Sequence, residues 1–332
     1  MSWSMRLAEF GSDMRERLTF RGRVSESVSR RGIAIAGAVI AAALLLYYPI
    51  GMIWIHKISD QIDFVAEPAA PEGGAHAVAM AAALVDREIN ENRWTANDPF
   101  FMPSSALDNM PNYQQGIIGA VARFAFELTD QLGRTRGSSQ TDSDLQEAAG
   151  LLQYSGTKWV WDPSISLMPT AASEQQYQKA IASLRRYNQR LAGGSAVFER
   201  RGDNLLATLD RIALDIGSSS AVLDQHVSAE AGSFIDLRAD DLFYGIKGQN
   251  YAYYMLLREL GRDFENVIRE RELNTAWAQM LDSMRKAASL DPGVVINGSP
   301  DGQFMPSHLV AQGFYLLRAR TQLREITNIL LK

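Results

Sequence analysis

Cysteine is absent from the 332-residue chain, and histidine is scarce. Without cysteine the chain can form no disulfide bond, and no thiolate is available as a nucleophile or as a zinc ligand. The four histidines are His56, His76, His226 and His308, and no two of them are spaced i, i+4 as in a helical zinc motif. We therefore predict no cofactor and no local metal site, which leaves open a site assembled from distant segments.

The common local signatures of enzymes are also missing. The sequence contains no Walker A loop, no GxGxxG and no GxSxG nucleophile elbow. The net charge is −5, and because the first 31 residues carry about +3, the remainder carries about −8. Such an acidic remainder argues against nucleic acid as a partner. These absences favour a non-enzymatic protein without excluding an enzyme.

One long hydrophobic run, Ile33–Ile55, contains no charged residue. A helix of roughly 20 apolar residues spans about 30 Å of hydrocarbon, so we predict a transmembrane helix over residues 32–56. A cleaved signal peptide and a buried core helix are the alternatives. The bulky residues Tyr47, Tyr48 and Trp54 do not fit a cleavage site, and they suit an aromatic belt at the membrane interface.

The charges that flank this run predict its orientation. Seven arginines precede it, of which Arg30 and Arg31 lie next to the membrane, whereas only His56 and Lys57 follow closely. Positively charged flanks remain in the cytoplasm. We therefore predict a single-pass protein of the bacterial inner membrane, with a cytoplasmic N-terminus and a periplasmic C-terminal domain.

The N-terminal arm has a helical pattern of apolar residues. One helix face carries Trp3, Leu7, Phe10, Met14 and Leu18. Such a helix can lie in the cytoplasmic membrane interface with Trp3 and Phe10 buried. It can equally dock on a cytoplasmic partner, and a loosely ordered tail is the plain alternative.

Small residues mark one face of the predicted transmembrane helix. Gly37 and Ala41 are four residues apart, a spacing that lets two membrane helices approach closely. We therefore expect the membrane itself, and either a protein partner or a second copy of the chain, as partners of this helix. Alanine is also common in apolar helices, so the spacing can arise by chance.

The rest of the chain predicts a mostly α fold. The predicted regions are a cytoplasmic amphipathic arm (1–31), the transmembrane helix (32–56), a linker rich in proline and glycine (57–74) and a periplasmic α-helical domain (75–332). Apolar residues at helical spacing predict a multi-helix bundle with two long ordered loops, 94–111 and 294–306. Gly217 and the serines after it predict a kink or a break in one helix.

Polar residues in the loops and at one helix start are candidates for a polar cleft. The candidates are Asp98, Asn109, Asp240, Asp241 and His308. Asp240 and Asp241 open a predicted helix, where acidic residues simply favour the helix dipole. Loops rich in Asn and Asp also commonly bond their own backbone. These residues become a site only if the fold brings them together beside a pocket.

Four strings of residues carry a resemblance to a known family. Tyr47–Met52, Asp98–Phe101, Asp203–Leu206 and the C-terminal Arg320–Leu331 resemble a family of proteobacterial single-span inner-membrane proteins. That family is known as a domain of unknown function, number twenty-three thirty-three. The resemblance covers most of the chain from the hydrophobic run to the C-terminus. It implies the same membrane location and carries no activity or catalytic residue.

Two hypotheses for the function follow. The first is a non-enzymatic, membrane-anchored periplasmic scaffold or accessory subunit of the cell envelope. The second is a periplasmic enzyme or binding protein that acts on cell-wall or lipid material. A pocket with several ionisable groups of perturbed pKa favours the second, and a broad exposed apolar surface favours the first.

Overall fold

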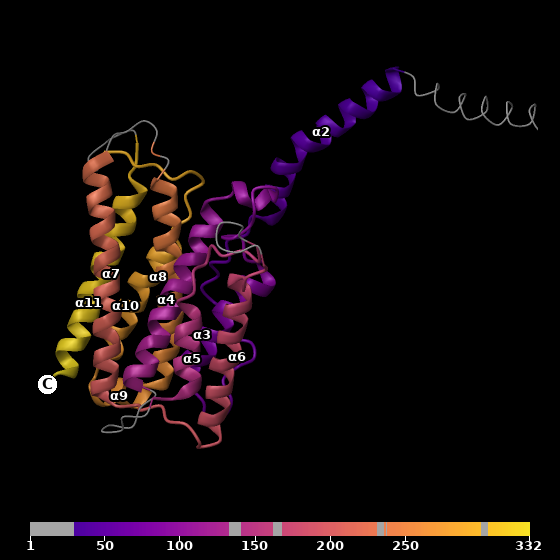
Figure 1. Ribbon diagram of the computed structural model, residues 1–332. Coiled ribbons are helices and arrows are strands. Elements are labelled where there is room, and N and C mark those ends of the chain that lie inside the picture. The colour runs from indigo at the N-terminus through magenta and orange to yellow at the C-terminus, as the bar shows by residue number, and fades with distance from the viewer. Residues whose placement is uncertain (1–29, 133–140, 162–167, 231–235, 237, 300–304) are drawn as a thin grey trace, which may run out of the picture. The chain divides into compact units, whose positions relative to one another are not determined.

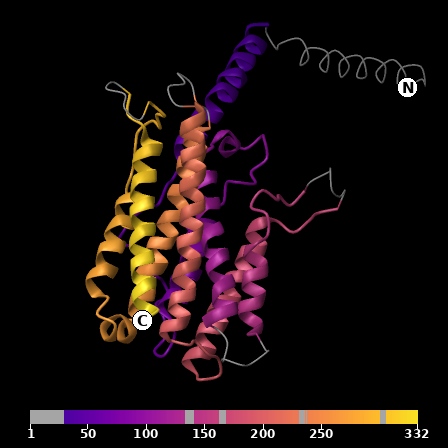
Figure 2. The same ribbon diagram turned by 90° about the vertical axis from the view of Figure 1, so that its left-hand side faces the viewer.

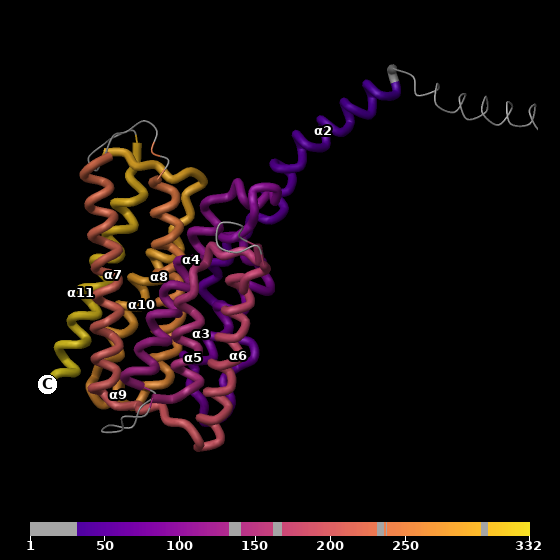
Figure 3. Tube along the Cα trace, viewed as in Figure 1, coloured from indigo at the N-terminus to yellow at the C-terminus, as the bar shows by residue number. Residues whose placement is uncertain are grey.

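The computed structural model describes residues 30–132, 141–161, 168–230, 236, 238–299 and 305–332 (Figures 1 and 3). The chain divides into two compact units, Met1–Trp54 and Ile55–Lys332, and the second is called the helical unit below. Within the described ranges every regular element is helical, apart from one isolated bridge between Asn297 and Ser307. The predicted mostly α fold is confirmed. The predictions for Trp3 and Phe10 concern residues outside the described ranges.

The first unit contributes α2 (Arg30–Ile55), and Arg30 and Arg31 form its start. Of the helices described, α2 is the one long and apolar enough to cross a membrane, and its Gly32–Ile55 portion is unburied. The rings of Tyr47 and Tyr48 meet edge to face, 5.5 Å apart, and Trp54 is exposed. Gly37 and Ala41 are exposed as well, so the small-residue face of α2 is accessible.

The helical unit is a bundle built around α8. Its elements are α3 (His76–Asp86), η1 (Arg87–Glu91), η2 (Pro103–Ala106), α4 (Asn109–Glu127), η3 (Leu128–Leu132), α5 (Ser143–Leu152), α6 (Ser173–Ala192), α7 (Gly202–Glu230), α8 (Ala239–Asp263), α9 (Glu265–Glu270), α10 (Asn274–Ala288) and α11 (His308–Leu330). Helix α8 packs most extensively on α4 and also contacts α10 and α3. Helix α11 packs against both α7 and α10, and α6 packs against both α5 and α3 (Figures 1 and 2).

The close approach of α4 and α8 depends on glycine. A Cβ built on Gly116 of α4 would overlap the carbonyl oxygen of Gly245 and lie 2.8 Å from the backbone nitrogen of Gln249. A Cβ on Gly248 of α8 would likewise overlap the backbone of Tyr113. Backbone lies against backbone at this crossing, so no larger residue fits without separating the helices.

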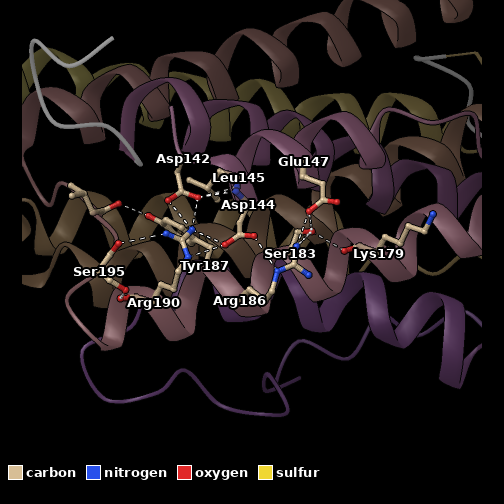
Figure 4. Close-up of polar contacts among 11 residues, drawn as sticks. Asp142, Asp144, Leu145, Glu147, Lys179, Ser183, Arg186, Tyr187, Arg190 and Ser195 are labelled. Carbon is tan, nitrogen blue, oxygen red and sulfur yellow. Dashed lines mark hydrogen bonds and ion pairs between the residues drawn. The ribbon is translucent and has the colours of Figure 1, made fainter. Parts of the chain in front are cut away.

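Helices α5 and α6 are joined along one side by a ladder of charged groups (Figure 4). Asp142 caps α5 by accepting from two backbone N–H groups, and Arg190 of α6 lies 2.7 Å from Asp142 and 2.6 Å from Asp144. One turn earlier in α6, Arg186 lies 3.1 Å from Asp144 and 2.7 Å from Glu147. The arginines and Glu147 are partly exposed, whereas Asp142 and Asp144 are largely buried, so the ladder fixes the register of α5 against α6.

Helix α7 differs from the sequence-based expectation. It runs without interruption from Gly202 to Glu230, so the predicted break at Gly217 is wrong. A Cβ on Gly217 would lie 2.8 Å from Nε of Arg320 on α11. The glycine makes room for an arginine of the neighbouring helix, which no local pattern in the sequence could indicate.

Candidate functional site

The fold brings some of the predicted polar residues together at the starts of α4 and α8. Oxygen atoms of Asp108, Asp240 and Asp241 all lie within 4.8 Å of one another, and Asn112 donates to Asp241 at 2.6 Å. We call these three aspartates the acidic corner, and Asn109 follows Asp108 as the first residue of α4. Burial raises the pKa of Asp241, and its two acidic neighbours raise it further.

The acidic corner also has a structural role. Asp108 accepts from the backbone N–H of Asn109, and Asp240 accepts from that of Asp241, so two of the carboxylates lie over helix starts. A helix start attracts negative charge through its free N–H groups and its dipole. This local bonding ties two of the three carboxylates to helix starts, and Asp241 also lines a pocket of about 730 Å³ with His226, Asp236 and Arg238.

The other two candidates bond elsewhere. Asp98 pairs with Arg93 at 3.1 Å and accepts from the hydroxyl of Ser104. His308 accepts through Nδ1 from the backbone N–H of Ile296 at 2.9 Å. Burial lowers the pKa of His308, so its imidazole is neutral at neutral pH. Asp98 and His308 therefore hold their own loops and have no described bond to the acidic corner.

A second polar assembly holds residues 57–66, a non-helical segment called the strap below. Backbone carbonyl groups of the strap accept hydrogen bonds from side chains of α4 and α8. These bonds run from Tyr113 to Ser59 at 2.9 Å, from Tyr251 to Gln61 at 2.8 Å, and from Arg258 to Ile62 at 2.9 Å and to Phe64 at 2.6 Å. Each such hydrogen bond contributes about 0.5–1.5 kcal/mol, and more when the donor is charged, so the three side chains together fix the path of the strap.

A buried lysine adds an ion pair to the strap. Lys247 of α8 is fully buried, and its Nζ lies 2.6 Å from Asp60 and 3.4 Å from Asp291. A buried ammonium group is costly unless it is paired, so Asp60 both neutralises Lys247 and ties the strap to α8. Lysine is rarely buried, and no local pattern marked Lys247 in the sequence.

Two consecutive buried charges complete this assembly. Arg87 and Glu88 lie in the π-helical turn η1, and their side chains form an ion pair with 2.8 Å between Nη2 and Oε1. The guanidinium of Arg87 lies over the rings of Phe64 and Tyr251, 4.6 and 5.0 Å from their centroids. Burial opposes the charge of Arg87, but Glu88 and the neighbouring phenols outweigh burial and raise its pKa. Arg87 therefore stays charged and clamps Phe64 of the strap.

A pocket of about 590 Å³ lies along the outer side of α4, and we call it the α4 groove. It is lined by Gln115, Ile118, Gly119, Ala122, Arg123, Phe126, Leu152, Gln153, Tyr154, Gly156, Tyr177 and Arg211. Residues 115–126 of α4 span about 16 Å at 1.5 Å per residue. Its lining combines apolar residues such as Ile118, Ala122 and Leu152 with polar and charged ones such as Gln115, Arg123 and Arg211.

Two arginines at the edge of the α4 groove are loosely paired. Arg123 lies 3.4 Å from Asp215, and Arg211 lies 3.4 Å from Glu127. Both arginine side chains are about half exposed, at 53% and 52%. Burial raises the pKa of Glu127, and Arg211 offsets part of that rise. The edge of the α4 groove therefore carries two guanidinium groups that remain half exposed to solvent.

The buried ionisable groups are committed to structural contacts. The charged residues buried in the described ranges are Arg87, Glu88, Glu127, Lys247, Glu259 and Asp263, and each has a charged or hydrogen-bonded partner. Burial also raises the pKa of Tyr251 to about 12 and that of Tyr253 well above its usual value. These phenols remain protonated donors at neutral pH, so they cannot act as bases.

A comparison with known families identifies the chain. No curated protein and no solved structure matches it. The family model DUF2333, described as an uncharacterized protein conserved in bacteria, matches residues 29–237 and 234–332. These ranges cover α2 and the whole helical unit, which is far more than half of the sequence. The chain therefore belongs to this bacterial family, as its resemblance at residues 47–52, 98–101, 203–206 and 320–331 predicted.

Proposed function

We propose that this protein is a non-enzymatic scaffold or accessory subunit of the bacterial cell envelope. In this proposal α2 anchors it in the inner membrane, the N-terminus is cytoplasmic and the helical unit is periplasmic. One observation carries the proposal: the buried charges Arg87 and Lys247, with Arg258, are directed at the strap, the segment that follows α2 in the chain. These three side chains hold the strap in position, and none of them lines the α4 groove.

The α4 groove is the surface we assign to a partner protein in this proposal. Helices α5 and α7 flank α4 here, and an apolar floor with a polar edge suits the apolar face of one amphipathic helix. The half-exposed Arg123 and Arg211 favour acidic residues on the polar side of that helix. The exposed small residues Gly37 and Ala41 offer a second contact, within the membrane, to a partner or a second copy.

The topology can be tested by labelling, because the chain has no cysteine of its own. Single cysteines are introduced at Ser2 in the N-terminal arm and at the exposed Glu270 of α9. In intact spheroplasts, a membrane-impermeant maleimide should label the cysteine at position 270 and should spare the one at position 2 until the cells are lysed. Labelling of position 2 alone in intact spheroplasts would reverse the proposed orientation.

The partner is tested by crosslinking in native membranes. A photoreactive benzoyl-phenylalanine replaces Phe126, which lines the α4 groove, or the similarly exposed Phe314 of α11 as a control. We expect a discrete protein adduct from position 126 only, and we expect its loss when Gly119→Leu fills the groove floor. The same adduct from both positions would contradict the assignment. A lipid or glycan adduct without protein would support the alternative, a binding protein or enzyme for lipid or cell-wall material.

A further inference from the structure

Two loops of the helical unit expose a group of aromatic side chains, called the aromatic patch below. It consists of the exposed Phe100 and Phe101, the half-buried Trp159 in contact with Phe101, and the exposed Trp161 two residues after Trp159. Phe100 is 82% exposed, Phe101 47% and Trp161 49%. The ring of Phe101 meets those of Phe100 and Trp159 edge to face, at 5.6 and 5.9 Å between centroids. Large aromatic side chains gathered at one exposed place usually mark a contact surface.

The two loops are fixed to each other and to the bundle. Trp94 donates through its indole to the carbonyl of Gly156 at 2.8 Å. Asn97 donates to the carbonyl of Lys158 at 2.8 Å and to Glu174 of α6 at 2.7 Å. Hydrogen bonds therefore hold the two loops that carry the aromatic patch, so little conformational entropy is lost when the rings bind a partner.

The aromatic patch lies at the end of the helical unit where the chain enters it, and this position indicates what the patch contacts. The loop that carries Phe100 and Phe101 leads through η2 into the start of α4. The helical unit begins in the chain at Ile55, and Lys57 bonds through its backbone N–H to the sulfur of Met110, in the first turn of α4. The chain thus enters the helical unit at the end that bears the patch, whereas α9 follows the opposite end of α8 (Figure 1).

We propose that the aromatic patch inserts into the interface of the membrane that α2 crosses. The inference rests on the proposed anchoring by α2, because the chain's entry from α2 is what brings this end of the helical unit to the bilayer. Aromatic rings partition into the headgroup region. They do so without attraction to anionic lipids, which suits an acidic unit whose Asp108, Asp240 and Asp241 lie at the same end. The partner is therefore the lipid surface, bound through apolar rings.

Site-specific fluorescence tests the inference on the full chain. Single cysteines replace Phe100 in the aromatic patch, Trp54 at the end of α2, or Leu214, an exposed apolar residue in the middle of α7. Each is labelled with an environment-sensitive dye, and the protein is reconstituted in phosphatidylcholine nanodiscs with or without lipids spin-labelled near the headgroup. We expect at least twofold quenching of the dye at positions 54 and 100, and no change at position 214.

The three labelled positions distinguish failure of the patch inference from failure of the proposed anchoring by α2. Quenching at position 54 without quenching at position 100 would overturn the inference and leave the anchoring intact. Absence of quenching at position 54 would overturn the anchoring by α2 and the inference together. Equal quenching at positions 100 and 214 would show contact not confined to the patch and would also overturn the inference. Phe100 is highly exposed, so its replacement should preserve the fold, and circular dichroism verifies this.

Discussion

Gly116 and Gly119 lie three residues apart on α4, yet alanine at these two positions should have opposite effects. A Cβ at position 116 would overlap Gly245 of α8 and lie 2.8 Å from Gln249, whereas a Cβ at position 119 meets nothing within 4 Å. Ordinary contacts of a Cβ begin at 3.4 Å, so the contact with Gln249 alone requires α4 and α8 to separate by 0.6 Å, and the closer overlap with Gly245 requires a larger separation still.

The size of the effect follows from three contributions. Alanine is favoured over glycine inside a helix by about 1 kcal/mol, and this gain applies to both variants. Overpacking of a tight core costs about 1–3 kcal/mol or more, and a gap of 0.5–1 Å forfeits a quarter to a half of each dispersion contact. Because α4 and α8 form the most extensive helix contact of the unit, we take the upper end. Gly116→Ala should therefore destabilise by about 2–3 kcal/mol, and Gly119→Ala should stabilise by about 0.5–1 kcal/mol.

Urea unfolding of the full chain in detergent measures both variants. The buried Trp94 and Trp277 report loss of the core by fluorescence, and the free energy of unfolding comes from linear extrapolation. Equal stability of the two variants, or a more stable Gly116→Ala, would refute the backbone contact between α4 and α8. An unchanged circular dichroism spectrum for Gly119→Ala is the control for correct folding.

Three further predictions concern charged groups. Asp60→Asn leaves the buried ammonium of Lys247 with one exposed partner and should destabilise the protein by about 2 kcal/mol. Lys247→Met removes the charge and should cost less than half of that. The reverse order of stabilities in urea unfolding would contradict the pairing. The pKa of Asp241 is raised in the fold, so the folded state binds more protons than the unfolded state between pH 3.8 and the raised pKa. Stability therefore falls across this pH interval and stays lowered above it. Asp241→Asn should therefore raise the melting temperature at pH 7 and leave it nearly unchanged at pH 3.5; a lower melting temperature at pH 7 would argue against the raised pKa. Asp263 accepts hydrogen bonds from two backbone N–H groups at the start of α3, at 2.8 and 2.9 Å. Asp263→Ala should therefore lower the free energy of unfolding by about 1–2 kcal/mol, and Asp263→Asn should lower it by less. Equal losses of stability in thermal melts would show that the cap is not the cause.

Several elements could be predicted because their signals are local. The helix that Asp240 and Asp241 were expected to open is α8, which begins at Ala239, since the spacing of apolar residues acts within a few residues. The hydrophobic stretch of α2 is likewise a matter of length and composition. The expected break at Gly217 failed for the opposite reason: the glycine accommodates Arg320, about a hundred residues away.

The composition of the candidate site depends on contacts between residues that are distant in the sequence. The sequence marks Asp240 and Asp241 at one helix start and Asn109 at another, but only the fold brings Asp108 and Asn112, more than a hundred residues earlier in the chain, against the two aspartates. The α4 groove was not predicted at all, because a groove consists of space between helices and leaves no periodic mark in any of them.

By itself, the sequence determined the family, the mostly helical fold and the apolar helix α2, because these follow from residue strings, periodicity and composition. Only the tertiary structure decided how the strap is held and which loops share an end of the helical unit. The buried Lys247 shows the physical reason, because its isolated burial would be costly and is tolerated only beside Asp60, almost two hundred residues earlier in the chain. The energy of such a pair depends on the distance between its charges and on their burial, and the fold sets both.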